Sequence, residues 1–177
     1  MPRTVDGMRR VSFSDEHCSV ARALDLVGDW WTLMIVRDLS LGLRRFDQIQ
    51  ADLGISRNVL TERLEMLVSN EIVSRTNIAR TGTRYEYRLT EKGRDLIPVL
   101  FALIEWGDKW NPDPRAPYTE IVHTVCDHVT VPVPTCSHCG EVVHHGELTS
   151  RPGPAWVDDP DHPIARARRD RQQPDRA

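Results

Sequence analysis

The stretch FDQIQADLGISRNVLTERLEMLV, residues 46–68, decides the fold, because a glycine separates two apolar runs at helical spacing. The runs are Phe46, Ile49 and Leu53, then Leu60, Leu64, Leu67 and Val68. Each run places its apolar side chains on one face of a helix. Gly54 permits a tight turn between the two helices, and Ser56 is a good N-cap for the second. The stretch therefore predicts a helix–turn–helix that packs on one core.

Further helices and two strands are predicted around this unit. Residues 19–27 have helical spacing, and Asp29 caps a second, mostly apolar helix that ends at Gly42. Residues 72–79 and 84–90 are predicted strands joined by a glycine-centred tip. Thr90 caps a last long helix over residues 91–110, which Pro98 is expected to bend. This order is that of a winged helix–turn–helix domain, so the predicted fold class is α+β, mainly α.

The exposed side of this domain carries side chains suited to DNA. The second helix of the helix–turn–helix presents its first turn to the major groove, where arginine pairs well with guanine and asparagine with adenine. The hairpin tip can place an arginine on the adjacent backbone or in the minor groove. The predicted DNA contacts are Arg44, Arg45, Ser56, Arg57, Asn58, Thr61, Arg63, Arg80, Thr83 and Arg84. The alternative is a winged helix that docks on other proteins, because many three-helix cores bind no DNA.

Charge and hydropathy narrow the function classes further. The chain has a net charge of −3, yet residues 44–94 carry ten Lys and Arg against seven Asp and Glu, which permits nucleic-acid binding. The N-terminus has no apolar segment typical of a secretory signal, and no apolar stretch is long enough to span a membrane. We therefore expect a cytoplasmic protein without a membrane partner, whose cysteines are reduced or metal-bound.

The stretch HTVCDHVTVPVPTCSHCGEVVHHG, residues 123–146, holds three of the four cysteines and five of the seven histidines. Cys136 and Cys139 have the spacing of a zinc knuckle, and Gly140 allows the left-handed backbone that points N–H groups at sulfur. Cys126 is the predicted third ligand. The fourth is His128 or, alternatively, His123, with His144 and His145 behind them. The prediction is a structural zinc in a small zinc-ribbon-like β appendage; the alternative is a tail with incidental cysteines.

Three motifs in order resemble the HxlR-type family of bacterial transcriptional regulators, within the MarR-like superfamily. They are HCSVARALDLVGDWWTLMIVRDLSLG (17–42), FDQIQADLGISRNVLTERLEML (46–67) and YRLTEKGRDLIPVLFALIEWGDKW (87–110). The resemblance covers residues 17–110. The chain departs from the family pattern at Ser19, where proline is usual, at Trp30, where a basic residue is common, and in a wing without prolines.

The resemblance implies a homodimer built on the first and last helices, which binds a pseudo-palindromic operator. The predicted interface residues are Leu100, Leu103, Trp106 and Trp110. Cys18 stands at the position of a family cysteine that senses electrophiles or oxidants in some relatives, which requires a thiolate. The alternative for Cys18 is a small apolar residue at the dimer seam. An unknown small molecule is the other possible effector.

The predicted organisation has five parts: a flexible arm (1–16), the DNA-binding and dimerisation domain (17–110), a Pro-rich linker (111–122), the zinc-ribbon-like appendage (123–150) and a disordered basic tail (151–177). The predicted function is a sequence-specific, dimeric, DNA-binding transcriptional regulator. The alternative is a protein-docking module of the transcription machinery with a winged helix and a zinc ribbon. No enzyme and no organic cofactor are predicted, because no HExxH or paired carboxylate–water arrangement accompanies the cysteines.

Overall fold

The computed structural model describes residues 13, 18–115, 119–154 and 162–172. The chain divides into two units, Met1–Val142 and Val143–Ala177. The expected N-terminal arm lies outside the described residues, apart from Phe13 and its immediate contacts. Within the described ranges, no helix combines the length and the apolar character that crossing a membrane requires.

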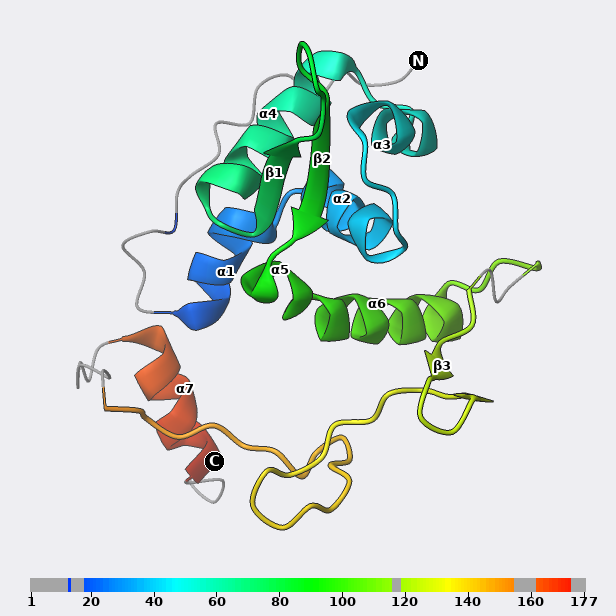
Figure 1. Ribbon diagram of the computed structural model, residues 1–177. Coiled ribbons are helices and arrows are strands. Elements are labelled where there is room, and N and C mark those ends of the chain that lie inside the picture. The colour runs from blue at the N-terminus through cyan, green and yellow to red at the C-terminus, as the bar shows by residue number, and fades with distance from the viewer. Residues whose placement is uncertain (1–12, 14–17, 116–118, 155–161, 173–177) are drawn as a thin grey trace, which may run out of the picture. The chain divides into compact units, whose positions relative to one another are not determined.

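The first unit begins with α1 (Ser19–Val27), α2 (Trp30–Ser40), α3 (Phe46–Leu53) and α4 (Arg57–Ser69) (Figure 1). The Asp29 carboxylate caps α2 by accepting a hydrogen bond from the Trp31 N–H at 3.0 Å. Gly54 has a φ of 63° and turns the chain between α3 and α4. The Ser56 hydroxyl then caps α4 by accepting from the Val59 N–H at 3.3 Å. The predicted helix–turn–helix is thus confirmed, with the predicted caps.

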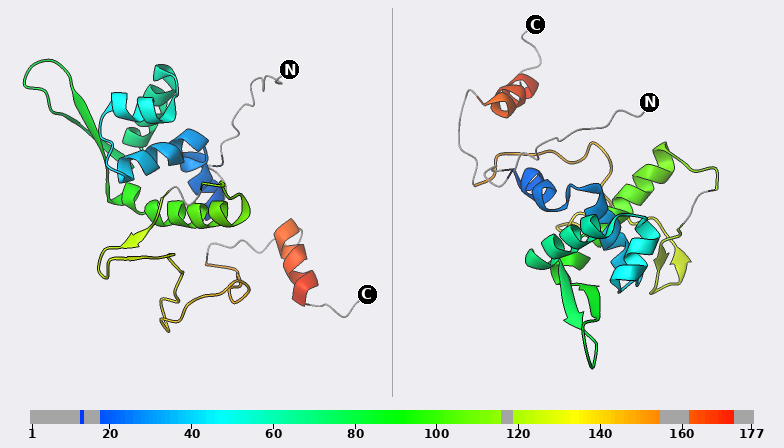
Figure 2. Two further views of the ribbon diagram at one scale, coloured as in Figure 1. Left: turned by 90° about the vertical axis from the view of Figure 1, so that its right-hand side faces the viewer. Right: turned by 90° about the horizontal axis from the view of Figure 1, so that it is seen from above.

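A two-stranded wing follows the helix–turn–helix. Strand β1 (Val73–Asn77) pairs antiparallel with β2 (Tyr85–Leu89), so that Val73 lies opposite Leu89 and Asn77 opposite Tyr85. The hairpin projects away from the helices (Figure 2). Both strands lie inside their predicted ranges and are one or two residues shorter at each end.

The core of the first unit lies between α2, α3, α4 and the base of the wing. Its buried apolar residues are Ile35, Val36, Leu39, Ile49, Ile55, Leu60, Leu64, Leu67, Ile72, Val73, Tyr87 and Leu89. Burial of one such side chain contributes about 1.5–3 kcal/mol to stability, so the leucine stripe of α4 alone holds that helix firmly on the core. In β2, alternate side chains face this core, because Tyr87 and Leu89 are buried and Arg88 between them is exposed.

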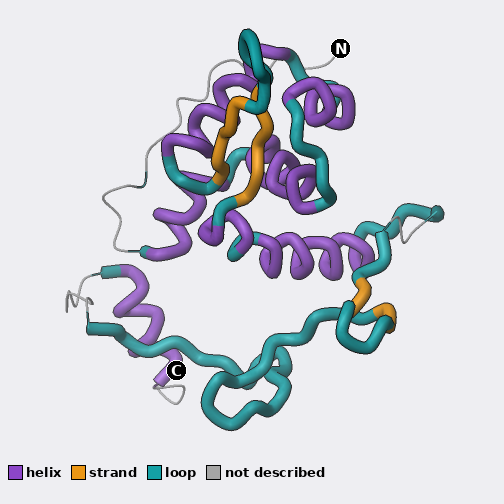
Figure 3. The backbone as a smooth tube through the Cα atoms, viewed as in Figure 1, coloured by secondary structure: helices purple, strands orange, loops and turns teal. Residues whose placement is uncertain are grey.

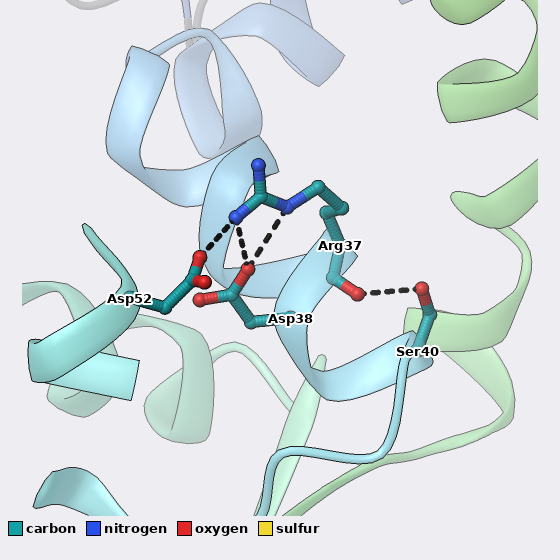
Figure 4. A network of polar contacts seen from close by, with 4 residues as sticks. All are labelled: Arg37, Asp38, Ser40 and Asp52. Atoms are coloured by element: carbon teal, nitrogen blue, oxygen red, sulfur yellow. Dashed lines mark hydrogen bonds and ion pairs between the residues drawn. The ribbon is translucent and has the colours of Figure 1, made fainter. Parts of the chain in front are cut away.

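The Arg37 guanidinium links α2 to α3 (Figure 4). The Arg37 side chain donates to Asp38 Oδ1 from Nε at 2.9 Å and from Nη2 at 2.6 Å, and Nη2 also pairs with Asp52 of α3. Asp38 is only 1% exposed. Burial raises the pKa of the Asp38 carboxyl, and the hydrogen bond and charge of Arg37 oppose that rise. The ion pairs therefore compensate part of the cost of burying a charge.

The last helix differs from its prediction. Instead of one helix over residues 91–110, the structure has α5 (Glu91–Arg94) and α6 (Ile97–Trp110). Thr90 caps α5 as predicted, with its hydroxyl accepting from the Gly93 N–H at 3.2 Å. Pro98 occupies the first turn of α6. A proline inside a continuous helix would lack one N–H donor and would clash with the preceding turn, so the chain ends one helix and begins another.

The remainder of the chain is mostly loop (Figure 3). Strands β3 (Val122–His123) and β4 (His128–Val129) form a short antiparallel hairpin, and Thr135 forms an isolated bridge with Val142. In the second unit, Pro163–Gln172 form helix α7. The expected disordered tail is wrong for these residues: Pro163 suits a first helical turn, and the alanines, arginines and glutamine that follow are good helix formers.

Close packing between α5 and the start of the wing leaves no room for a side chain at position 93, where the sequence has glycine. A Cβ at this position would lie 2.2 Å from the Ile72 carbonyl oxygen, which belongs to the backbone and cannot turn aside. We expect Gly93→Ala to lower the free energy of unfolding by about 1–3 kcal/mol, as overpacked cores do. Urea titration at one protein concentration measures this effect. Gly107→Ala is the control, because nothing lies within 4 Å of a Cβ there; equal losses in both variants would contradict the close approach.

Candidate nucleic-acid interface

The N-terminal turn of α4 faces solvent. Since Leu60, Leu64 and Leu67 are buried on one side of this helix, the side chains of the opposite side are exposed. They include Arg57, Asn58 and Thr61. A helix N-terminus carries unpaired backbone N–H groups and partial positive charge, which favour a phosphate or a base edge.

A cleft of about 500 Å³ separates this helix from the wing. Residues of α3, α4 and both wing strands line it, among them Arg45, Arg57, Arg75 and Arg84. Two acidic residues, Asp47 and Glu65, also line the cleft. Four guanidinium groups against two carboxylates give the cleft a net positive charge, which suits an anionic partner.

Two of these arginines lie over aromatic rings. The Arg57 guanidinium lies 5.0 Å from the centroid of the Phe46 ring, and that of Arg75 lies 4.6 Å from the Tyr85 ring. Such stacking is worth about 0.5–1 kcal/mol at an exposed site and restricts the rotamers of a long side chain. Both charges are therefore held at the cleft before a partner arrives.

Sequence reasoning missed Arg75, although the signal was available. In β1, Arg75 lies across from Tyr87, on the side of the hairpin that faces α4. Alternation along two paired strands places residues 73, 75 and 77 on the same face as 85, 87 and 89. The predicted contacts included no residue of the first strand.

Asn77 organises the wing tip, and it too was not predicted. Its side-chain oxygen accepts from the N–H groups of Ala79 and Arg84, both at 3.1 Å. Its amide group donates to the Gly82 carbonyl at 3.3 Å, where φ is +77°. At the base of the wing, the Tyr87 N–H donates to the Arg44 carbonyl at 2.8 Å. These bonds fix where the tip arginines stand relative to α3.

The structure assigns different surroundings to the ten predicted DNA contacts. Five of them line the cleft: Arg45, Arg57, Thr61, Thr83 and Arg84. Three others are exposed outside the cleft lining: Ser56, Asn58 and Arg80. Of the cleft residues, Arg45 also pairs with Asp47 at 3.1 Å. The remaining two contacts bind neighbouring elements of the protein. Arg44 Nη1 donates to the Leu39 carbonyl at 3.0 Å, and Arg63 pairs with Asp29 at 3.1 Å.

The predicted dimer face is largely exposed. Val99, Leu103, Trp106 and Trp110 form one apolar stripe along α6, at helical spacing. Leu100 differs from the other predicted interface residues, because it packs against the core of its own domain. On α1, Val20 and Leu24 are also exposed, and no residue of that helix is buried.

The cysteines lie at two separate kinds of position. Cys18 is exposed and is the N-cap residue of α1, without a side-chain capping bond. Cys136 and Cys139 lie in one tight turn, where the backbone N–H groups of Cys139 and His138 lower the pKa of the Cys136 thiol. His123 Nδ1 lies 3.2 Å from Cys126 Sγ in another turn. Among the described residues, no three His, Cys, Asp or Glu side chains are grouped so that they could hold a metal ion.

Comparison with known proteins agrees with this geometry. Residues 26–114 match the family model described as HxlR-like helix-turn-helix. The HTH-type transcriptional regulator Rv3095 of Mycobacterium tuberculosis is 43% identical over 138 residues, which are 78% of this chain and 87% of that protein. That match is longer than the matched family segment, so the similarity extends beyond the helix–turn–helix domain.

Two solved structures resemble the chain over most of its length. The crystal structure of PA1607, a proposed transcription factor, has a TM-score of 0.70 and 32% identity, and covers 80% of this chain and 99% of that one. The structure of PA1374 from Pseudomonas aeruginosa, another proposed transcription factor, has a TM-score of 0.56 at 32% identity, with coverage of 80% and 96%.

The Arg63–Asp29 pair predicts a stability effect at a position first proposed to contact DNA. Both side chains are about one-fifth exposed, and Asp29 also caps α2. We expect Arg63→Ala to lower the free energy of unfolding by about 1–2 kcal/mol, because a charged hydrogen bond is lost and Asp29 remains desolvated. Glu62→Ala is the control, because it removes only the exposed and longer ion pair of Arg63, at 3.8 Å, which contributes little. Thermal and urea unfolding measure the stability of both variants. If Arg63→Ala is as stable as wild type, Arg63 is again a candidate DNA contact.

Proposed function

The chain belongs to the HxlR-like helix-turn-helix family, and from this premise we propose that it binds a specific DNA operator as a homodimer. The family consists of transcriptional regulators and not of enzymes. DNA is therefore the partner of this chain; the docking geometry, the contact residues and the oligomeric state are the proposed part.

The basic cleft between α4 and the wing is the observation that carries the proposal. The N-terminal turn of α4 enters the major groove, and the wing follows the adjacent backbone or minor groove. The cleft then receives the DNA backbone between the two elements. Four arginines line this one cleft, which supports this docking.

The contacts divide into those that read bases and those that position the protein. Arg57 and Asn58, on the first turn of α4, are the base-reading candidates. Arg75 and Arg84 of the wing are candidates for phosphate contacts, which carry no sequence information directly. Thr61 and Ser56 complete the contacts from α4. Arg63 and Arg44 stabilise the position of this surface by binding Asp29 and the Leu39 carbonyl, respectively.

The homodimer is supported by the apolar stripe of α6. Two tryptophans and a leucine of this stripe are about half or more exposed, and an exposed patch of this kind favours association. A second copy of the chain covers the exposed stripe and agrees with the homodimer that the family resemblance implies. Two copies related by a twofold axis present two α4 helices, which suits a pseudo-palindromic operator.

Regulation and metal binding complete the proposal. Cys18 is an accessible thiol at a helix N-terminus and is the candidate target of an electrophile or oxidant effector; a small-molecule effector is the alternative.

We infer a structural Zn²⁺ ion in the Cys- and His-rich segment, supported by the free thiols of Cys126, Cys136 and Cys139. When bound, the ion supplies folding free energy to a segment that has little core.

The test of DNA binding begins with selection of bound sequences from a random DNA pool, followed by anisotropy titrations across a salt series. Arg57→Ala should weaken binding to the selected site about 10- to 100-fold and relax its specificity. Arg75→Ala should weaken binding to all sequences and reduce the salt slope by about one. Arg88→Ala is the matched control, because Arg88 lies on the same hairpin but does not line the cleft. If no sequence is enriched, the protein-docking alternative is favoured.

The dimer is tested by sedimentation equilibrium. Trp106→Glu should shift wild-type dimer to monomer, because a charge at the centre of the α6 stripe cannot be buried without a partner. Leu41→Glu changes a side chain with the same exposure, 62%, outside α6 and should leave the mass unchanged. A dimeric Trp106→Glu variant with native circular dichroism would place the interface elsewhere.

A further inference from the structure

The two cysteine-bearing turns of the C-terminal segment have the same backbone conformation. In the first, the Asp127 N–H donates to the His123 carbonyl at 2.8 Å; in the second, the Gly140 N–H donates to the Cys136 carbonyl, also at 2.8 Å. The residue that closes each turn has a left-handed backbone, with φ of 56° at Asp127 and 77° at Gly140. The two turns are therefore equivalent position by position.

This equivalence pairs the donor side chains of the two turns. His123 corresponds to Cys136, and Cys126 corresponds to Cys139, each pair separated by two residues. In the first turn the donors already lie together, with His123 Nδ1 3.2 Å from Cys126 Sγ. Asp127 is unusual because non-glycine residues seldom adopt this backbone region, although aspartate tolerates it better than most. The match between the turns is not evident in the sequence, because the first turn has aspartate at the position where the second turn has glycine.

His128 has a different environment. It lies in β4, beyond the end of the first turn, and its Nδ1 is 2.5 Å from the Cys126 carbonyl oxygen. This contact involves Nδ1 and does not by itself decide whether His128 is a ligand. The equivalence of the two turns and the short distance from His123 to Cys126 are the observations that favour His123. The residue at the equivalent position of the second turn is Glu141, which offers no thiol or imidazole.

We propose that His123, Cys126, Cys136 and Cys139 are the four ligands of one Zn²⁺ ion, so that His128 is not a ligand. This inference rests on the metal site of the proposed function and names its donors. One imidazole and three thiolates form a common tetrahedral site for structural zinc. Binding replaces the three thiol protons, which pass to solvent, with three Zn–S bonds, and the neutral imidazole donates the fourth lone pair.

The two turns must approach each other to complete this site. Each turn holds two donors, and the described residues contain no group of three that could hold a metal ion. Nine residues, 127–135, connect Cys126 to Cys136, and an extended segment of this length spans at most about 30 Å. The connection is thus long enough for the turns to meet on one ion. Metal binding and closure of the segment are then a single event, as in other small structural zinc sites.

The first turn is also connected to the helix of the proposed dimer. Ile121, Val129 and Val131, from the hairpin and its flanks, line a shallow cavity of about 170 Å³ together with residues of α6. The α6 residues are Ile104, Glu105 and Asp108. An ion that orders the hairpin therefore orders a segment packed on α6.

The test measures zinc per chain in the full-length protein, purified under reducing conditions and loaded with zinc alone. Wild type should bind about one ion per chain, and Cys136→Ser and Cys139→Ser should lose it. His123→Ala should bind at least about tenfold more weakly in a competition titration with a chelator, whereas the matched His128→Ala variant should stay within about twofold of wild type. Cobalt substitution adds a direct readout: only the variants that keep all four ligands should give the strong visible bands of a tetrahedral thiolate site.

The possible failures are distinguishable. If wild type binds zinc but His128→Ala loses it while His123→Ala keeps it, the ligand assignment is wrong and the metal site remains. If reduced wild type binds no zinc, both the site and its ligands fail, while the anisotropy titrations judge DNA binding separately. A Cys136–Cys139 disulfide in metal-free native protein, detected by alkylation and mass measurement, would also overturn the proposal, because those thiols would then form a redox pair.

Discussion

The burial of one leucine stripe determines how this protein meets its partner. Leu60, Leu64 and Leu67 of α4 pack on the core, so the opposite face of the helix points to solvent. Since each buried leucine contributes about 1.5–3 kcal/mol, turning the helix about its axis would cost several kcal/mol. The exposed positions of Arg57, Asn58 and Thr61 are therefore consequences of core packing. The side chains that we propose to contact DNA are therefore exposed without any additional interaction.

The arginines of the domain serve two purposes, and their partners separate them. Arg37, Arg44 and Arg63 bind carboxylates or carbonyls of neighbouring elements and connect α2, α3 and α4. Arg57 and Arg75 instead lie over aromatic rings at the edge of the cleft. A cation over a ring keeps its hydrogen-bond donors available, whereas one paired with a carboxylate does not. The stacked arginines are therefore better suited to bind phosphate or a base edge.

The fold could be predicted from the sequence because helical spacing, caps and strand alternation are local signals. The caps at Asp29 and Ser56 and the turn at Gly54 follow from single residues. Arg63 could not be assigned in this way, since its partner Asp29 lies more than thirty residues earlier and no period connects them. The break before α6 was only half predicted, because a proline can either bend a helix or end it, and the sequence does not distinguish the two.

The C-terminal segment is stabilised by a different principle from the DNA-binding domain. From Thr119 to Val142 no described side chain is buried, and valines such as Val125, Val129 and Val133 are exposed. Hydrophobic burial therefore contributes little to holding this segment in one conformation, although its two turns have defined hydrogen bonds. A segment of this size needs a crosslink, a metal ion or a partner to be stable. The thiols and the imidazole at the equivalent positions of the two turns are the donors from which we propose that such a metal site is built, and in that proposal the cysteines of this segment are structural residues.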